Sequence, residues 1–122
     1  MAVELNHTIV PAHDPQASAQ FLADLLGIEV SPPVAHFTPV TLANGVTLDY
    51  DQSEHVELHH YAFLVGGAEY AAAFARIRDG GITYYADPAC QRPGETYTGQ
   101  SGQQGLYFRD PDGHLMEIIT RA

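Results

Sequence analysis

The stretch Leu58–Val65 reads LHHYAFLV, in which two adjacent histidines open a run of apolar and aromatic residues. Such a run is typical of a β-strand, on which successive side chains point to opposite faces. His59 and His60 are therefore expected to face opposite sides, so at most one of them looks toward any given site. Residues elsewhere in the chain indicate which one.

An internal repeat selects His60. Three pairs of identical residues share one offset of 53 positions, namely His7 and His60, Phe21 and Phe74, and Gly27 and Gly80. Choosing His59 instead would break the other two pairings. In both copies the histidine stands on an apolar segment that is followed by an alanine-rich helical pattern, a glycine and a short strand.

Each copy contains one predicted helix. In the first copy Asp14 is suited to cap the helix, Pro15 to form its first turn and Gly27 to end it. In the second copy Gly67 stands at the capping position, which predicts a weaker start, and Gly80 stops the helix. The apolar face of the first helix is expected to consist of Ala17, Phe21, Leu22, Leu25 and Leu26, and that of the second of Tyr70, Phe74 and Ile77.

Short strands are expected after each helix. They are predicted at Ile28–Val30, Phe37–Leu42 and Val46–Tyr50 in the first copy, and at Ile82–Tyr85, Gly105–Arg109 and Leu115–Thr120 in the second. The turns ANG at Ala43–Gly45 and DPDG at Asp110–Gly113 join the last two strands of each copy. Each copy thus reads βαβββ. Because about 60 residues bury little apolar surface alone, the two copies are expected to pair their sheets.

The two modules are expected to make up a single domain over residues 1–122. Module one covers about 1–53 and module two about 54–122. The second module is longer mainly because of the polar segment Ala86–Gly105, ADPACQRPGETYTGQSGQQG. Long polar loops in small domains are often functional, so we expect this segment to act as a lid over a cavity.

The composition excludes several classes of function. The chain has 15 acidic and 5 basic residues and a net charge of −10, which repels nucleic-acid phosphates and anionic membranes. The lone Cys90 cannot build a disulfide framework, and the first residues lack a signal-peptide pattern, so a cytoplasmic location is expected. What remains as a ligand is a small molecule or a protein.

Strand parity brings three candidate metal ligands together. Glu117 and His7 each share a strand face with apolar neighbours, where a buried polar group is costly unless it is paired or bound to metal. If the two copies pack as a pseudo-twofold pair, His7, His60 and Glu117 converge on one cavity, with Asp49 close by. Each histidine alone would be read as a hydrogen-bonded core residue, but their symmetric placement favours a metal site. Two imidazoles and one carboxylate suit Fe(II), Zn(II) or Mn(II).

Three segments of the chain resemble the vicinal oxygen chelate superfamily. They are LNHTIV with the aspartate that follows at Leu5–Asp14, HYAFLV at His60–Val65 and YFRDPDGHLMEI at Tyr107–Ile118. The group includes glyoxalases, extradiol ring-cleaving dioxygenases, fosfomycin-modifying thiol transferases and bleomycin-sequestering proteins. The resemblance implies an α+β fold in which two βαβββ modules form a curved mixed sheet of roughly eight strands around a metal and substrate cavity. It also implies metal ligands at His7, His60 and Glu117.

The resemblance places dioxygenase chemistry slightly ahead of isomerisation. Dioxygenases of the group carry a tyrosine ten residues before the metal-binding glutamate, which makes Tyr107 a candidate catalytic residue; the alternative for Tyr107 is packing on a strand. Glyoxalases use a fourth ligand, for which Asp49 stands at the matching repeat position, so glyoxalase or lyase chemistry stays open. Fe(II) is the favoured metal, and Zn, Mn or Ni would also suit. The substrate would chelate the metal through two neighbouring oxygens.

Two other branches of the group fit less well. Ile9 and Tyr97 stand where fosfomycin-modifying members have a substrate-contacting threonine and a phosphonate-binding lysine, so a phosphonate ligand is not expected. Bleomycin-sequestering members usually lack the metal ligands, but a non-catalytic drug-binding protein stays an alternative. By analogy with the group we expect a homodimer that acts on a small molecule, with no nucleic-acid or membrane partner.

Overall fold

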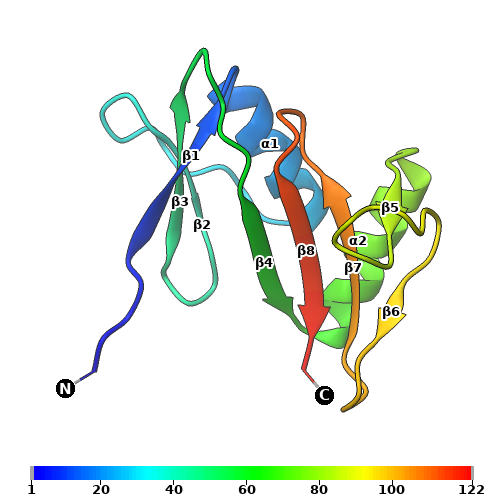
Figure 1. Cartoon of the computed structure of the whole chain (residues 1–122). Coiled ribbons are helices and arrows are strands. Elements are labelled where there is room, and N and C mark those ends of the chain that lie inside the picture. Colours follow the sequence, from blue (N-terminus) through cyan, green and yellow to red (C-terminus); the bar gives the residue numbers. More distant parts are fainter. Residues whose placement is uncertain (1, 122) are drawn as a thin grey trace. The chain divides into compact units, whose positions relative to one another are not determined.

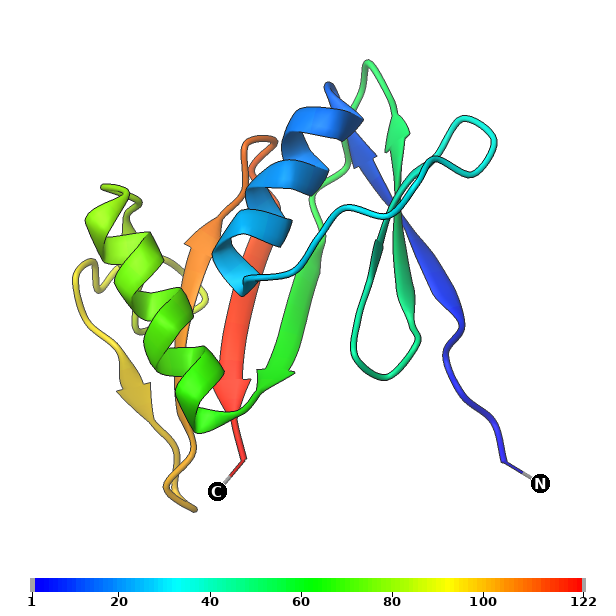
Figure 2. The same cartoon turned by 180° about the vertical axis from the view of Figure 1, so that it is seen from behind.

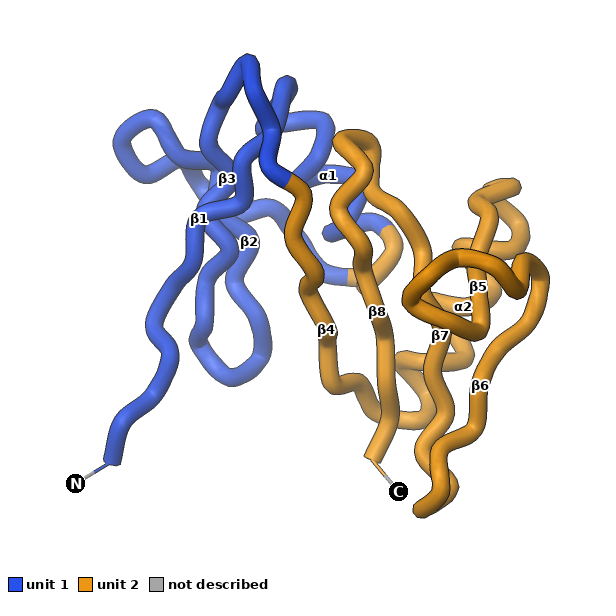
Figure 3. Tube along the Cα trace, in the orientation of Figure 1, with its two compact units in different colours: residues 1–24, 28–57 blue, residues 25–27, 58–122 orange. Residues whose placement is uncertain are grey.

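The computed structural model describes residues 2–121, along which two helices and eight strands follow one another in the order β1 α1 β2 β3 β4 α2 β5 β6 β7 β8 (Figure 1). This mixture confirms the predicted α+β class. The chain divides into two compact units, residues 1–24 with 28–57 and residues 25–27 with 58–122 (Figure 3). Within the described residues, no helix is long and apolar enough to cross a membrane.

The first unit is built on a three-stranded sheet. The strand order is β1 (His7–Ala12), β3 (Thr47–Gln52) and β2 (Thr38–Thr41), with β1 parallel and β2 antiparallel to β3. The turn between β2 and β3 forms as predicted, because Gly45 adopts a φ of 88°. The strand predicted at Ile28–Val30 is wrong: only a single bridge joins Val30 to Val40. Pro32 and Pro33 follow after Ser31, and a proline has no N–H to continue a ladder.

Helix α1 (Pro15–Leu26) begins and ends where the sequence predicts. The backbone N–H of Ala17 donates to Oδ1 of Asp14 at 3.1 Å, and Gly27 ends the helix with a φ of 72°. The predicted apolar face is wrong at Ala17, which is exposed in the first turn, because Ser18 takes the inward position. The rest of that face is buried at Leu22 and Leu25 and partly buried at Phe21 and Leu26.

The second unit is built on a five-stranded sheet. Its strands are β4 (His60–Val65), β8 (Leu115–Thr120), β7 (Gln104–Arg109) and β5 (Tyr84–Tyr85) in spatial order, and β6 (Tyr97–Thr98) also pairs with β7. Strand β4 runs parallel to β8 and lies at the edge of the sheet, and the other pairings are antiparallel. Helix α2 (Gly67–Asp79) covers one face of this sheet (Figure 2).

The second unit differs from the prediction in three features. The N-cap of α2 is Gly66 rather than Gly67, and no side chain caps it. The strand predicted at Ile82–Tyr85 is only two residues long. The polar segment Ala86–Gly105 contains the unpredicted strand β6, so it is not a plain loop. The last two strands match the prediction to within one residue.

The final strand separates the core from the site. Met116 and Ile118 on β8 are fully buried, and Leu106 and Phe108 on the neighbouring strand β7 are fully buried with them. Glu117 lies between Met116 and Ile118 in sequence and therefore points to the opposite face of the sheet. The predicted parity of this strand is confirmed, and it sends the glutamate away from the apolar core.

Candidate metal centre

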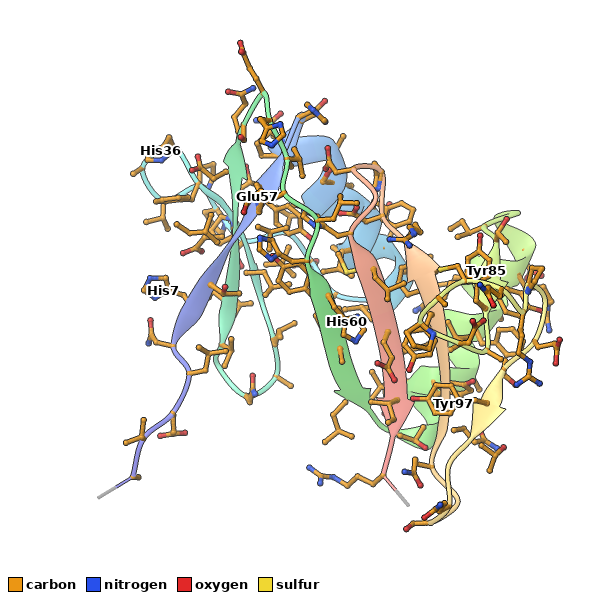
Figure 4. All side chains as sticks on the ribbon, viewed as in Figure 1. His7, His36, Glu57, His60, Tyr85 and Tyr97 are labelled. Carbon is orange, nitrogen blue, oxygen red and sulfur yellow. The ribbon has the colours of Figure 1, made fainter. Side chains whose placement is uncertain are left out.

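Strands β4 and β8 bring His60 and Glu117 together. The parallel register pairs His60 with Leu115 and Ala62 with Glu117, which puts the histidine and the glutamate on one face of the sheet, two residues apart along the strands. Nε2 of His60 lies 3.1 Å from Oε1 of Glu117. His60 extends from the edge strand β4, in green in Figure 4.

The second ring nitrogen of His60 indicates what the pair can hold. Nδ1 lies 3.0 Å from the carbonyl oxygen of Leu115, which only accepts hydrogen bonds, so Nδ1 must carry a proton and donate. In the neutral ring, Nε2 then directs a lone pair at the carboxylate of Glu117. Two electron-rich atoms at 3.1 Å need a cation at that place, which is either a proton on Nε2 or a metal ion. An imidazole oriented through its other nitrogen is a common arrangement of metal-binding histidines.

Glu117 is buried and firmly held. Its side chain is 10% exposed, whereas that of His60 is 45% exposed. The hydroxyl of Tyr97 donates to Oε2 of Glu117, and Tyr107 on β7 pairs with Glu117 in the register of β7 and β8. Because a buried carboxylate is costly unless its oxygens have partners, the bond from Tyr97 offsets the cost of burial and fixes the orientation of the group. Oε1 faces His60 while Oε2 is turned to Tyr97.

Tyr97 and Tyr107 are both neutral beside Glu117. Burial raises the pKa of Tyr97 well above its ordinary value, and the hydrogen bond to Glu117 raises it further. Burial also raises the pKa of Tyr107, and the negative charge of Glu117 adds to the effect. At neutral pH both hydroxyls therefore keep their protons. The ring of Tyr107 lies 5.9 Å from that of His60 and 5.6 Å from that of Tyr97, so three rings surround the carboxylate.

The other predicted ligands belong to the first unit. His7 is exposed on β1, where its Nδ1 lies 2.7 Å from Oδ1 of Asn6. The register of β1 and β3 pairs His7 with Thr47 and Ile9 with Asp49, so His7 and Asp49 share one face of that sheet. Among residues 2–121, no three histidine, cysteine, aspartate or glutamate side chains gather into a metal-binding group. The structure thus unites two of the three predicted ligands, and the ligand triad stays a prediction.

A family model described as the Glyoxalase/Bleomycin resistance protein/Dioxygenase superfamily matches residues 4–118. The chain belongs to this superfamily. The resemblance to the vicinal oxygen chelate group is thereby confirmed. Members of the superfamily generally use divalent metal ions and act on small molecules.

Several superfamily members can be compared with the whole chain. The solved structures named Oxidase ChaP-H2 and Oxidase ChaP-H1 share 54% and 50% sequence identity, with TM-scores of 0.96 and 0.95; the alignments cover 100% and 99% of this chain and 96% and 98% of theirs. Glutathione transferase FosA of Serratia marcescens is 26% identical, over 97% of this chain and 81% of that protein. A lactoylglutathione lyase structure from Agrobacterium tumefaciens shares the fold at 17% identity and a TM-score of 0.74, covering 98% of this chain and 94% of its own.

Sequence reasoning missed the role of Tyr97 in this superfamily member. In the sequence Tyr97 is noted only at the position of the phosphonate-binding lysine of fosfomycin-modifying members, whereas its hydroxyl bonds to Glu117. The available signal was Gly105, which pairs with Tyr97 across β6 and β7. A Cβ at Gly105 would collide with the ring of Tyr97. A glycine inside a strand often marks such a close approach.

Proposed function

We propose that this protein is a metal-dependent enzyme that oxidises a small molecule through ring-cleaving dioxygenase chemistry. The substrate would chelate the metal through two adjacent oxygens. The observation that carries this proposal is the facing pair of His60 Nε2 and Glu117 Oε1, 3.1 Å apart, with His60 oriented by Leu115. The identity of about half to the two oxidases supports oxidation over isomerisation.

The proposed ligands are His7, His60 and Glu117, with Asp49 as a candidate fourth ligand. Fe(II) is the favoured ion because two imidazoles and one carboxylate leave coordination positions open; Zn, Mn and Ni are the alternatives. When bound, the ion supplies Lewis-acid activation of the substrate oxygens. The chain contributes a ligand pair already aligned before the ion arrives.

The side chains around the pair have separate roles in this proposal. Tyr97 holds Oε2 of Glu117 and leaves Oε1 directed at His60. Tyr107 is the proposed catalytic residue. Its hydroxyl, protonated at neutral pH because its pKa is raised, can donate a hydrogen bond to a developing negative charge on a substrate oxygen. The three aromatic rings provide a wall against which a flat substrate can pack.

The surroundings of the site form a second part of the proposal. The segment Ala86–Gly105 carries Tyr97 onto Glu117, which supports its predicted role as a lid. By analogy with the superfamily we further propose a cytoplasmic homodimer, and the net charge of −10 supports the absence of nucleic-acid and membrane partners. Limited proteolysis within Ala86–Gly105 should abolish substrate binding. Unchanged turnover after cleavage would contradict the role of this segment as a lid.

The decisive test is the metal content of protein purified without oxygen. We expect bound iron, and a much larger loss of it in His60→Ala than in His59→Ala. His59 is the matched control because it neighbours His60 on the chain but contacts Tyr61 and His114 on the opposite face. Equal losses in the two variants would overturn the assignment of His60.

Oxygen uptake then separates the reaction classes. With iron restored, we expect consumption of dioxygen in the presence of aromatic compounds that carry two neighbouring hydroxyls. Bound zinc or nickel together with turnover in the absence of dioxygen would replace oxidation by isomerisation. Unchanged ligand affinity after chelation of the metal would indicate a sequestering protein instead.

A further inference from the structure

His114 is a fully buried polar residue in the turn between β7 and β8, and the proposed chemistry does not use it. Its backbone is fixed by Asp110, whose Oδ1 accepts the N–H of His114 at 2.8 Å and whose own N–H donates to the carbonyl of His114 at 3.0 Å. Gly113 allows the chain to close this turn with a φ of 96°. The imidazole therefore leaves a rigid base in a defined direction.

The ring of His114 reaches across to the start of β4. Its Nδ1 accepts the backbone N–H of His59 at 3.0 Å, which places the proton of the neutral ring on Nε2. The next residue, Leu115, donates its N–H to the carbonyl of His59 at 2.9 Å. Two consecutive residues thus hold both backbone groups of His59. Because β4 is an edge strand with β8 as its neighbour, these bonds determine where the strand begins.

The aromatic neighbours of His114 reinforce this hold from the same side. Its ring centroid lies 5.9 Å from that of His59, in a stacked arrangement, and 5.6 Å from that of Tyr61, edge to face. His59 and Tyr61 flank His60 in sequence, so both side chains point away from the face that His60 occupies. The residues on either side of His60 are therefore anchored to one buried ring.

We propose that His114 is a positioning residue that aims Nε2 of His60 at Glu117. The path runs from the Asp110 turn through the ring of His114 to the backbone of His59, and from there to His60. The bond between Nδ1 of His60 and the carbonyl of Leu115 depends on the same alignment of β4 with β8. This inference rests on the proposed function, because the His60 and Glu117 pair is taken to bind a metal ion.

Two amide substitutions separate the hydrogen bond from the bulk of the ring. In His114→Asn the amide oxygen can stand near the place of Nδ1 and still accept the N–H of His59, whereas in His114→Gln the amide lies near the place of Nε2. We expect His114→Gln to lower the affinity of metal-free protein for Fe(II) or Zn(II) about 10–100-fold, the usual effect of losing an outer hydrogen-bond partner. His114→Asn should stay close to the unchanged protein. Titration calorimetry measures the affinities, and amide hydrogen exchange of His59 should quicken only in His114→Gln.

The controls separate positioning from general destabilisation. Ile77→Val removes one methyl group from the buried face of α2 and should leave the metal affinity unchanged. Equal losses of affinity in Ile77→Val and His114→Gln, or in the Asn and Gln variants of His114, would overturn this inference alone. Unchanged metal affinity in His60→Ala would overturn the proposed function as well.

One measurement needs no variant. In the unchanged protein, nitrogen NMR of His114 should show an unprotonated Nδ1 and a protonated Nε2, as the bond from His59 requires. A proton on Nδ1 would overturn the inference even if every variant failed to fold.

Discussion

The two units place a histidine and an acid in the same register, but only one unit joins their side chains. His7 and Asp49 lie on β1 and β3 with the spacing that His60 and Glu117 have on β4 and β8. In the second unit the side chains meet at 3.1 Å, whereas His7 turns its Nδ1 to Asn6. The comparison teaches that a repeated backbone does not by itself make a repeated site. In the second unit the acid is the longer glutamate. The hydroxyl of Tyr97 holds its Oε2, and its Oε1 faces His60.

The largest expected effect comes from neutralising the two acids separately. Glu117→Gln keeps the shape of the side chain but removes the charge that faces His60. We expect a loss of metal affinity beyond the roughly 100-fold upper range for outer partners, because a direct ligand is weakened. Asp49→Asn is the matched change in the first unit and should lower the metal affinity much less. Equal losses of metal affinity in the two variants, measured by titration calorimetry, would indicate that Asp49 is a fourth ligand and would favour isomerisation.

Tyr107→Phe should affect turnover more than metal binding. The substitution removes a hydrogen-bond donor whose raised pKa keeps it protonated, but it preserves the ring beside His60. We expect kcat to fall about 100-fold, at the lower end of what one donor to a developing negative charge contributes. The metal affinity should change little because Tyr97 still holds Glu117. If the metal affinity fell about 100-fold while kcat of the metal-loaded enzyme stayed unchanged, Tyr107 would serve to position Glu117 and would not take part in the reaction.

Gly105→Ala tests the contact that distinguishes the second unit. The added Cβ would collide with the ring of Tyr97 and push its hydroxyl away from Glu117. We expect a loss of about 1–3 kcal/mol in the free energy of unfolding, as for other overpacked sites. Metal affinity should fall about 10-fold with it. Urea unfolding and metal titration measure the two effects.

Gly67→Ala is the control for this substitution. Gly67 is a helical position with open space around it. An alanine there should leave the metal affinity unchanged, and should keep the free energy of unfolding or raise it by about 0.5–1 kcal/mol. If Gly105→Ala also left both quantities unchanged, Tyr97 would not be held by the close approach of β6 to β7.

The sequence patterns predicted both ends of α1, the faces of the last strand and the meeting of His60 with Glu117, but not the contact of Tyr97 with Glu117. Asp14 and Gly27 bound α1 through the backbone chemistry of their immediate neighbours, and the alternation along β8 separates Glu117 from the core. The partnership of Tyr97 with Glu117 has no such local cause. It depends on β6 folding back onto β7 across residues 99–103, and within the polar segment Gly105 alone indicates such a close approach.

The smallest expected effects concern the starts of the two helices, which differ in their caps. Asp14→Ala removes the oxygen that accepts the N–H of Ala17, so the free energy of unfolding should fall by about 1 kcal/mol. At the matching place in the second unit Gly66 has no side chain, and Oε1 of Glu69 already reaches back to it. Gly66→Ser would complete a reciprocal cap with Glu69, once this flexible carboxylate moves aside for the new Cβ.

A serine in place of this glycine is expected to raise the free energy of unfolding by only a few tenths of a kcal/mol, since glycine is itself a tolerated cap. Gly66 has a φ of −71° and a ψ of 167°, which serine adopts without strain, so the backbone does not oppose the change. Urea unfolding of Asp14→Ala, Gly66→Ser and the unchanged protein measures both changes in the free energy of unfolding. A loss of stability in Gly66→Ser would mean that Glu69 cannot move, and that the second helix owes its start to the bare glycine.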